Sequence, residues 1–239
     1  MGPLQDILET WARFLYEGNA TLTFLRRRRW LILAVSLAVL IPCFWHRRIE
    51  AGDLASHVYN AWLAQLIGKG QAPGLYLAKQ WDNILFDVML LGLAKVAGFA
   101  TAQRIAVSVC VLVFFWGVFA FVSAVTERPP WSLTPPIAML AYGYSFSMGF
   151  MNYYLSLGLA CFGLALVWRA RTVDWIGAGI FAVLAYVAHP IGFLWLIGMV
   201  AYVRIRAKLP GWWKLVLPLT AVAGFSRTNW CCTGNGTWG

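Results

Sequence analysis

The chain has 239 residues, of which 61% are hydrophobic and 12% are charged, and its formal net charge is +10. Soluble domains carry about twice that share of charged residues, so the composition excludes an ordinary soluble protein. The long runs are continuously apolar, which excludes the alternating pattern of a membrane β-barrel. The predicted fold class is therefore all-α, a polytopic transmembrane helical bundle with about seven spans. The positive charge is expected to flank helices on the cytoplasmic side, and no basic domain indicates nucleic-acid binding.

The chain begins with a predicted cytoplasmic amphipathic segment over residues 1–24, which would rest on the membrane surface. A first span is predicted from about Leu25 to Trp45. No small-residue cleavage site follows this run, so it is expected to remain as an anchor. The four arginines at Arg26–Arg29 precede its apolar part and predict a cytoplasmic N-terminus.

An external loop is predicted over residues 46–104, and it opens with the sequence EAGDLASHVYNAWL at Glu50–Leu63. At 100° per residue, one narrow stripe of a helix here holds Asp53, His57, Asn60 and Ala64. The opposite face is apolar and holds Ala55, Val58, Tyr59, Trp62 and Leu66. This pattern predicts an external amphipathic juxtamembrane helix whose apolar face meets lipid or the helix bundle.

The polar stripe of this helix admits more than one interpretation. Asp53 follows Gly52 and could simply cap the helix, and His57 could pair with Asp53 at the i,i+4 spacing. The same two side chains could share a metal ion, but two ligands are too few to define a site. A functional role for the stripe is the third interpretation.

The apolar segment Ile84–Phe99 is short and contains Asp87 and Lys95. Charges at the bilayer centre cost several kcal/mol. If this segment stays outside the membrane, most of the basic residues fall on the cytoplasmic side, as the positive-inside rule requires. We therefore expect an external, interfacial or re-entrant helix.

The later apolar runs predict the remaining spans. They are Ile105–Val125, Leu133–Phe150, Tyr153–Trp168, Trp175–Ala188, Ile191–Val203 and a run starting near Trp213. The two runs around His189 are short and are flanked by arginines on both sides, so they predict a hairpin of two short helices. Its turn and the sequence Asn152-Tyr153-Tyr154 are both predicted on the external side. The helical region ends at residue 224, and the tail 225–239 breaks the pattern as a truncated or frame-shifted end would.

Several segments between Trp30 and Leu217 resemble the GT-C superfamily, integral-membrane glycosyltransferases that use polyprenyl-phosphate sugars. They are GDLASHVYNAWLAQLIGKGQAPGLY after the first span, Lys95-Val96-Ala97-Gly98, YSFSMGFMNYYLSLGLA and the hairpin LAYVAHPIGFLW. Many members carry an acidic motif followed by His or Tyr on a helix after the first span. The chain departs from the family in having only Glu50 near Asp53 as a partner acid, and His189-Pro190-Ile191 where Lys-Gly-Pro often stands.

The resemblance implies a membrane glycosyltransferase in which Asp53 acts as the general base on an acceptor hydroxyl. It implies transfer from a polyprenyl-phosphate sugar donor on the external face of a bacterial inner membrane, with membrane lipid as a further partner. The candidate substrate-binding residues are Glu50, His57, Asn60, Arg47, Arg48, Asn152, Tyr153, Tyr154 and His189. The sequence identifies no cofactor, although a divalent metal ion could neutralise the departing phosphate.

Several of these residues have structural alternatives, and so does the function. Arg47 and Arg48 could snorkel to lipid phosphates, His189 could satisfy the backbone of its own turn, and Asn152 could begin a helix. A transporter or flippase-like protein would also use broken helices and polar groups in a cavity. A non-catalytic membrane fragment or subunit is the third possibility.

Overall fold

The structure is a computed structural model that describes residues 26–45, 48–169 and 172–208, and every element in these ranges is a helix. This result confirms the predicted all-α fold. The chain divides into two compact units, Met1–Leu196 and Ile197–Gly239, and the fold below is that of the first unit. Three predicted segments lie outside the described residues, namely 1–24, the run starting near Trp213 and 225–239.

Three helices are long and apolar enough to cross a membrane: Arg26–Trp45, α3 (Leu85–Thr126), and Met151–Trp168 within α6 (Met151–Arg169). The chain is therefore a membrane protein by the length and composition of its helices. The predicted count of about seven spans is not confirmed by the described residues. Two further apolar helices are shorter, α7 (Thr172–Ala188) and α8 (Pro190–Lys208). Only His189 separates them, as predicted from the two short apolar runs.

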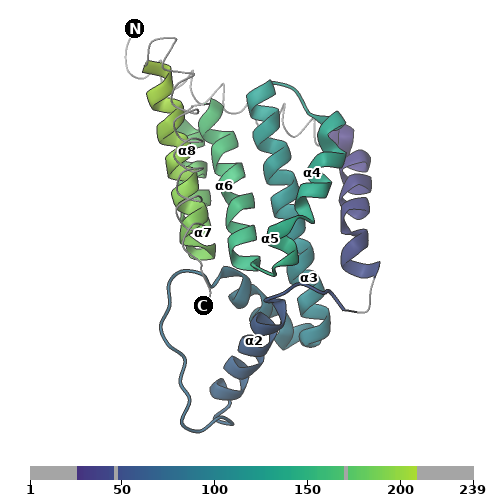
Figure 1. Cartoon of the computed structure of the whole chain (residues 1–239), viewed down its shortest axis with the longest axis vertical. Coiled ribbons are helices and arrows are strands. Elements are labelled where there is room, and N and C mark those ends of the chain that lie inside the picture. The colour runs from purple at the N-terminus through teal and green to yellow at the C-terminus, as the bar shows by residue number, and fades with distance from the viewer. Residues whose placement is uncertain (1–25, 46–47, 170–171, 209–239) are drawn as a thin grey trace, which may run out of the picture. The chain divides into compact units, whose positions relative to one another are not determined.

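Helix α6 packs between α3 and α7, and Figure 1 shows these helices side by side. The close approach of α3 to α6 depends on small residues. A Cβ atom on Gly117 would collide with the carbonyl of Gly158, and a Cβ atom on Gly158 would collide with the backbone of Phe114. Small residues that let helix backbones approach are typical of helix pairs in membranes. The tight pairing of α3 with α6 fixes the ends of both helices relative to each other.

The first helix, Arg26–Trp45, packs on this bundle through polar contacts between helices. The Trp116 indole N–H donates to the Ser36 hydroxyl at 3.0 Å. The Tyr142 hydroxyl donates to the Val39 carbonyl at 2.6 Å. Polar side chains are costly in an apolar bundle unless they find such partners, so these contacts position the first helix.

The predicted span Leu133–Phe150 is wrong as a single helix. The segment forms a short 3-10 turn, Trp131–Leu133, followed by α4 (Thr134–Ala141) and α5 (Tyr144–Ser147). Gly143 is extended, and Gly149 has a φ of 77°, a conformation that glycine adopts without strain. The glycines interrupt a run whose hydrophobicity alone would suit a span.

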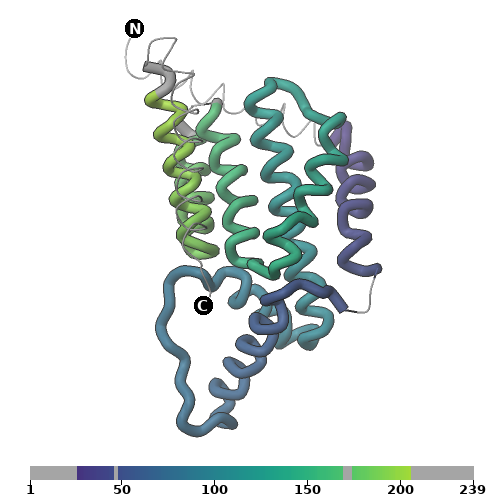
Figure 2. Tube along the Cα trace, in the orientation of Figure 1, coloured from purple at the N-terminus to yellow at the C-terminus, as the bar shows by residue number. Residues whose placement is uncertain are grey.

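Helix α3 contains a break where the external segment Ile84–Phe99 was expected to end. Gly98 has φ 74° and ψ 160°, which is not helical, so α3 consists of two helical segments. The predicted first segment thus exists as a separate piece of helix before Gly98, and its position relative to a membrane stays a prediction. The chain between α2 (Leu54–Gly68) and α3 forms a long open loop in the trace of Figure 2.

Helix α2 packs against α3 through the side that carries His57, with Leu54 and Ala61 buried. The predicted apolar face is divided: Tyr59 and Trp62 are exposed, at 57% and 43%, whereas Val58 packs against the core of the bundle. The expectation that this face meets lipid or the bundle is therefore confirmed for the bundle at Val58. The His57 side lies inward because His57 finds a partner on α3, as described below. Contact of the exposed Tyr59 and Trp62 with lipid stays a prediction.

Candidate functional site

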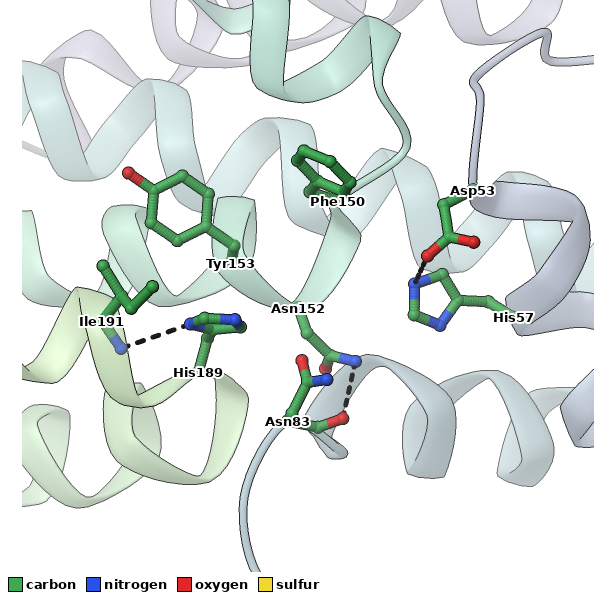
Figure 3. A pocket seen from close by; sticks show the side chains of 8 residues that line it. All are labelled: Asp53, His57, Asn83, Phe150, Asn152, Tyr153, His189 and Ile191. Carbon is green, nitrogen blue, oxygen red and sulfur yellow. Dashed lines mark hydrogen bonds and ion pairs between the residues drawn. The ribbon is translucent and has the colours of Figure 1, made fainter. Parts of the chain in front are cut away.

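A pocket of about 380 Å³ lies where four segments of the chain meet. These segments are the start of α2, the start of α3, the start of α6 and the turn between α7 and α8. Figure 3 shows the eight lining side chains, Asp53, His57, Asn83, Phe150, Asn152, Tyr153, His189 and Ile191. Helix ends carry backbone groups without partners inside the helix, so this junction is rich in hydrogen-bonding groups.

The turn before α6 fixes the backbone of Asp53. The Gly52 N–H donates to the Ser147 carbonyl at 2.9 Å, and the Asp53 N–H donates to the Met148 carbonyl at 2.9 Å. Gly149 makes this approach possible, because a Cβ atom there would collide with the backbone nitrogen of Asp53. Asp53 is the N-cap residue of α2, as predicted, but its side chain makes no capping hydrogen bond. Its carboxylate is 48% exposed and faces the pocket.

His57 lies between two carboxylates. Its Nδ1 atom is 2.7 Å from Oδ1 of Asp87, and its Nε2 atom is 3.7 Å from Oδ2 of Asp53. The side chain is only 12% exposed, and the ring edge contacts Phe86 at a centroid distance of 5.2 Å. The predicted i,i+4 pair of Asp53 and His57 is therefore present, and α3 adds a second acid to it.

The pKa of His57 is raised above its ordinary value. Burial by itself lowers the pKa, but the hydrogen bond to Asp87 and the negative charges of Asp87 and Asp53 outweigh it. The imidazolium form is therefore favoured over neutral imidazole more strongly than for a histidine in water.

Asn152 is 2% exposed and joins α6 to the start of α3. Its Oδ1 atom accepts the backbone N–H of Phe86 at 2.7 Å, a group of the first helical turn. Its Nδ2 atom donates to the Asn83 carbonyl at 2.9 Å and to Oδ2 of Asp87 at 2.7 Å. Figure 3 shows the contact with Asn83. The buried amide is thus fully paired, as a buried polar group must be.

His189 satisfies the backbone of its own turn, which was one of the two interpretations of this residue. The Ile191 N–H donates to Nδ1 of His189 at 3.2 Å. Burial lowers the pKa of His189, and the charge of Asp82 offsets part of that effect. Because Nδ1 accepts a hydrogen bond, the neutral ring carries its proton on Nε2.

Ser156 holds the turn that carries His189. Its hydroxyl lies 2.8 Å from the Ala185 carbonyl and 3.0 Å from the His189 carbonyl, and Ser156 itself is fully buried. Gly192 packs directly on this hydroxyl, where a Cβ atom would collide. These contacts fix the conformation of the turn on the side that faces the pocket.

No protein-family model, curated protein or solved structure matches this chain. The function of the pocket is therefore inferred from its own residues.

The structure brings five of the ten predicted site residues together in this pocket: Asp53, His57, Asn152, Tyr153 and His189. The other predicted site residues that the structure describes lie outside the pocket. Tyr154 is buried in the core, where its ring stacks on Phe114 and its hydroxyl donates to the Ala141 carbonyl. Glu50, Asn60 and Arg48 are exposed and do not line the pocket. Arg47 lies outside the described residues.

Four residues of the site were not among the ten predicted site residues, namely Asp87, Asn83, Phe150 and Ile191. Asp87 carried a signal, because an acid inside an apolar segment is costly unless it is paired or functional. Asn83 has a positive φ of 55°, which asparagine adopts more readily than most residues, but this conformation belongs to the fold and is not visible in the sequence. The sequence contained no comparable signal for Phe150 and Ile191, which are ordinary apolar residues.

The described residues contain no group of three or more His, Cys, Asp and Glu side chains that could hold a metal ion. His57 Nδ1 is hydrogen-bonded to Asp87, so only its Nε2 atom faces Asp53. No lysine or arginine is among the side chains that line the pocket. The lining instead offers an accessible carboxylate, two imidazoles, two amides and two aromatic rings. Such a set can take a proton from a hydroxyl, donate hydrogen bonds and stack against a sugar ring.

Proposed function

We propose that the chain is a membrane glycosyltransferase of the GT-C type. It transfers a sugar from a polyprenyl-phosphate donor to an acceptor hydroxyl on the external face of a bacterial inner membrane. The observation that carries the proposal is the half-exposed carboxylate of Asp53 in a pocket lined by side chains that suit a sugar. The pocket adjoins the starts of two helices that can cross a membrane, α3 and α6, so a donor anchored in lipid can reach it.

In the proposed reaction, Asp53 takes the proton of the acceptor hydroxyl while the hydroxyl oxygen attacks the anomeric carbon. The bond between this carbon and the phosphate oxygen breaks, and polyprenyl phosphate leaves with the electron pair. Phe150 and Tyr153 offer ring faces, and Asn83 offers an amide, for the transferred or accepting sugar. No lysine or arginine lines the pocket, so we place the donor phosphate outside it.

The proposal predicts that Asp53→Asn abolishes most of the activity. General bases contribute about 10²- to 10⁴-fold, so kcat should fall by at least about a hundredfold. The test uses the full-length protein in nanodiscs, polyprenyl-phosphate donors carrying glucose, mannose, galactose or arabinose, and host membrane extract as the acceptor source. Transferred sugar is measured by radiolabel.

The matched control for this experiment is Glu127→Gln. Glu127 is an exposed acid at the opposite end of α3 from the pocket, so its loss should leave turnover unchanged. Equal activity of Asp53→Asn and the native chain would remove Asp53 from catalysis. A native chain that transfers none of these sugars, but moves a donor across proteoliposomes, would be a transporter instead.

A further inference from the structure

Asp87 is an acid with both carboxylate oxygens in use. Oδ1 is 2.7 Å from Nδ1 of His57, and Oδ2 accepts a hydrogen bond from Nδ2 of Asn152 at 2.7 Å. Asp87 also lies in the first turn of α3, where the helix dipole favours a negative charge. These contacts hold the carboxylate group of Asp87 beside His57. We call His57, Asp87 and Asn152 the Asp87 network.

The Asp87 network fixes which nitrogen of His57 faces the pocket. With Asp87 Oδ1 accepting the Nδ1 proton, the neutral ring has its lone pair on Nε2. That atom is 3.7 Å from Oδ2 of Asp53, and Figure 3 shows the two side chains facing each other. A proton on the Asp53 carboxyl can therefore pass to Nε2 of His57 after a small shift of either side chain.

Two carboxylates act on His57, those of Asp53 and Asp87. Asp53 faces it from the start of α2, and Asp87 faces it from α3. The start of α6 contributes the neutral amide of Asn152, and the turn before α8 contributes His189, which lines the same pocket. Asp82 acts on His189. Two carboxylates therefore act on one imidazole.

We propose that His57 takes the acceptor's proton from Asp53, and that Asp87 is the positioning residue that orients His57 and stabilises its imidazolium form. The step moves one proton from the Asp53 carboxyl oxygen to Nε2 of His57 and returns Asp53 to its carboxylate form. This role rests on the proposed glycosyl transfer. It requires neutral His57 at the start of each turnover, so activity should rise with pH as His57 loses its proton.

The first test needs no substrate. The full-length chain is labelled with ¹³C at histidine Cε1 and titrated in detergent micelles by NMR, with the His57 signal assigned from His57→Gln. The native chain should show a His57 midpoint above that of an ordinary histidine, because its pKa is raised by the carboxylates. Asp87→Asn should move this midpoint to lower pH.

A matched control separates Asp87 from a general loss of negative charge. Asp82→Asn removes a neighbouring acid that acts on His189, so it should lower the His189 midpoint and leave the His57 midpoint in place.

A second variant tests whether a lowered His57 midpoint in Asp87→Asn comes from misfolding. The double exchange Asp87→Asn with Asn152→Asp keeps one acid and one amide facing each other, but moves the charge away from His57. It should fold and still show the lowered His57 midpoint.

The second test follows kcat against pH in the sugar-transfer assay. Asp87→Asn should move the rising part of the kcat–pH profile to lower pH, in parallel with the His57 midpoint. It should also lower the maximal kcat by about tenfold or more. An unchanged His57 midpoint in Asp87→Asn would overturn the inference whatever the activity. A midpoint that moves while the rising part of the profile stays would overturn the proton transfer. Absence of sugar transfer by the native chain would overturn the proposed function, and the titration would still decide whether Asp87 controls the proton on His57.

Discussion

At the scale of single residues, Asn152 determines the geometry of the pocket. One amide satisfies a backbone donor of α3, a backbone carbonyl before α3 and the carboxylate of Asp87. The Phe86 N–H is buried, so leaving it without a partner would be costly, and the other two contacts are partly buried. A single side chain on α6 therefore fixes the start of α3 and, through Asp87, the orientation of His57.

The change Asn152→Asp tests this role and carries a pH signature. The new carboxylate still accepts the Phe86 N–H, but it can no longer donate to Asp87, and two negative charges face each other. We expect a loss of about 3 kcal/mol in the free energy of unfolding at pH 8. At pH 5 the loss should be smaller, because two adjacent carboxyls readily share a proton, which restores a hydrogen bond to Asp87.

The measurement is the unfolding free energy in mild detergent, compared with the native chain at each pH. Ser147→Ala is the matched control, because its hydroxyl is exposed and donates to the Tyr144 carbonyl within its own turn. It should show no such pH dependence. A loss for Asn152→Asp that is the same at both pH values would contradict a charge pair at this site.

At the scale of elements, the turn Ser147–Gly149 joins two parts of the site. It receives the backbone hydrogen bonds of Gly52 and Asp53, and it leads directly into α6, which carries Asn152 and Tyr153. The start of α2 and the start of α6 are therefore held together by main-chain contacts. These main-chain contacts fix the backbone of Asp53, and its carboxylate, which also pairs with His57, lines the pocket.

Substitutions at two glycines with similar backbone conformation distinguish the cost of local backbone strain from the cost of losing the contact between α2 and the turn before α6. Gly149 has φ 77° and faces the Asp53 backbone, whereas Gly70 has φ 69° and open space around it. Gly70→Ala should cost only the left-handed penalty of about 1 kcal/mol. Gly149→Ala should cost several times more, because it also displaces the start of α2, and it should lower sugar transfer at least about tenfold.

Unfolding free energies and turnover of both variants provide the comparison. Similar stability and similar turnover for the two would show that the turn does not hold Asp53. A selective loss in Gly149→Ala, with Gly70→Ala close to the native chain in turnover, is the expected pattern.

Much of the arrangement of the helices could be predicted from the sequence. The lengths of apolar runs predicted the helix break at His189, and the placement of arginines predicted that this turn and Asn152 share one side with Asp53. The interruption of Leu133–Phe150 was not predicted, because it depends on how Gly143 and Gly149 are used in the fold. The partner of the polar stripe on α2 was also not predicted, since periodicity defines faces but not the acid on α3 that receives His57. Asp87 is a long-range partner, and no local pattern pairs it with His57.

At the scale of the molecule, α3 sets the relation between the pocket and a membrane. Its part from Phe99 to Thr126 is about 40 Å long at 1.5 Å per residue, enough to cross the hydrocarbon core of about 30 Å. The pocket lies near the start of α3, and Glu127 caps its other end. If this helix crosses, the loop before α3 and Glu127 lie on opposite sides of the membrane.

This relation predicts a labelling pattern in spheroplasts. Tyr76 is 85% exposed in the loop between α2 and α3, so Tyr76→Cys should react with a membrane-impermeant maleimide in intact spheroplasts. Glu127→Cys should react only after permeabilisation, because the arginine tetrad Arg26–Arg29 predicts that its side is cytoplasmic. Both changes are made in a chain whose five cysteines have been replaced, and sugar transfer by that chain serves as the control for folding. The reverse pattern would place the pocket in the cytoplasm, where a donor that requires the external face cannot reach Asp53. Equal labelling of both positions in intact spheroplasts would mean that this part of α3 does not cross the membrane.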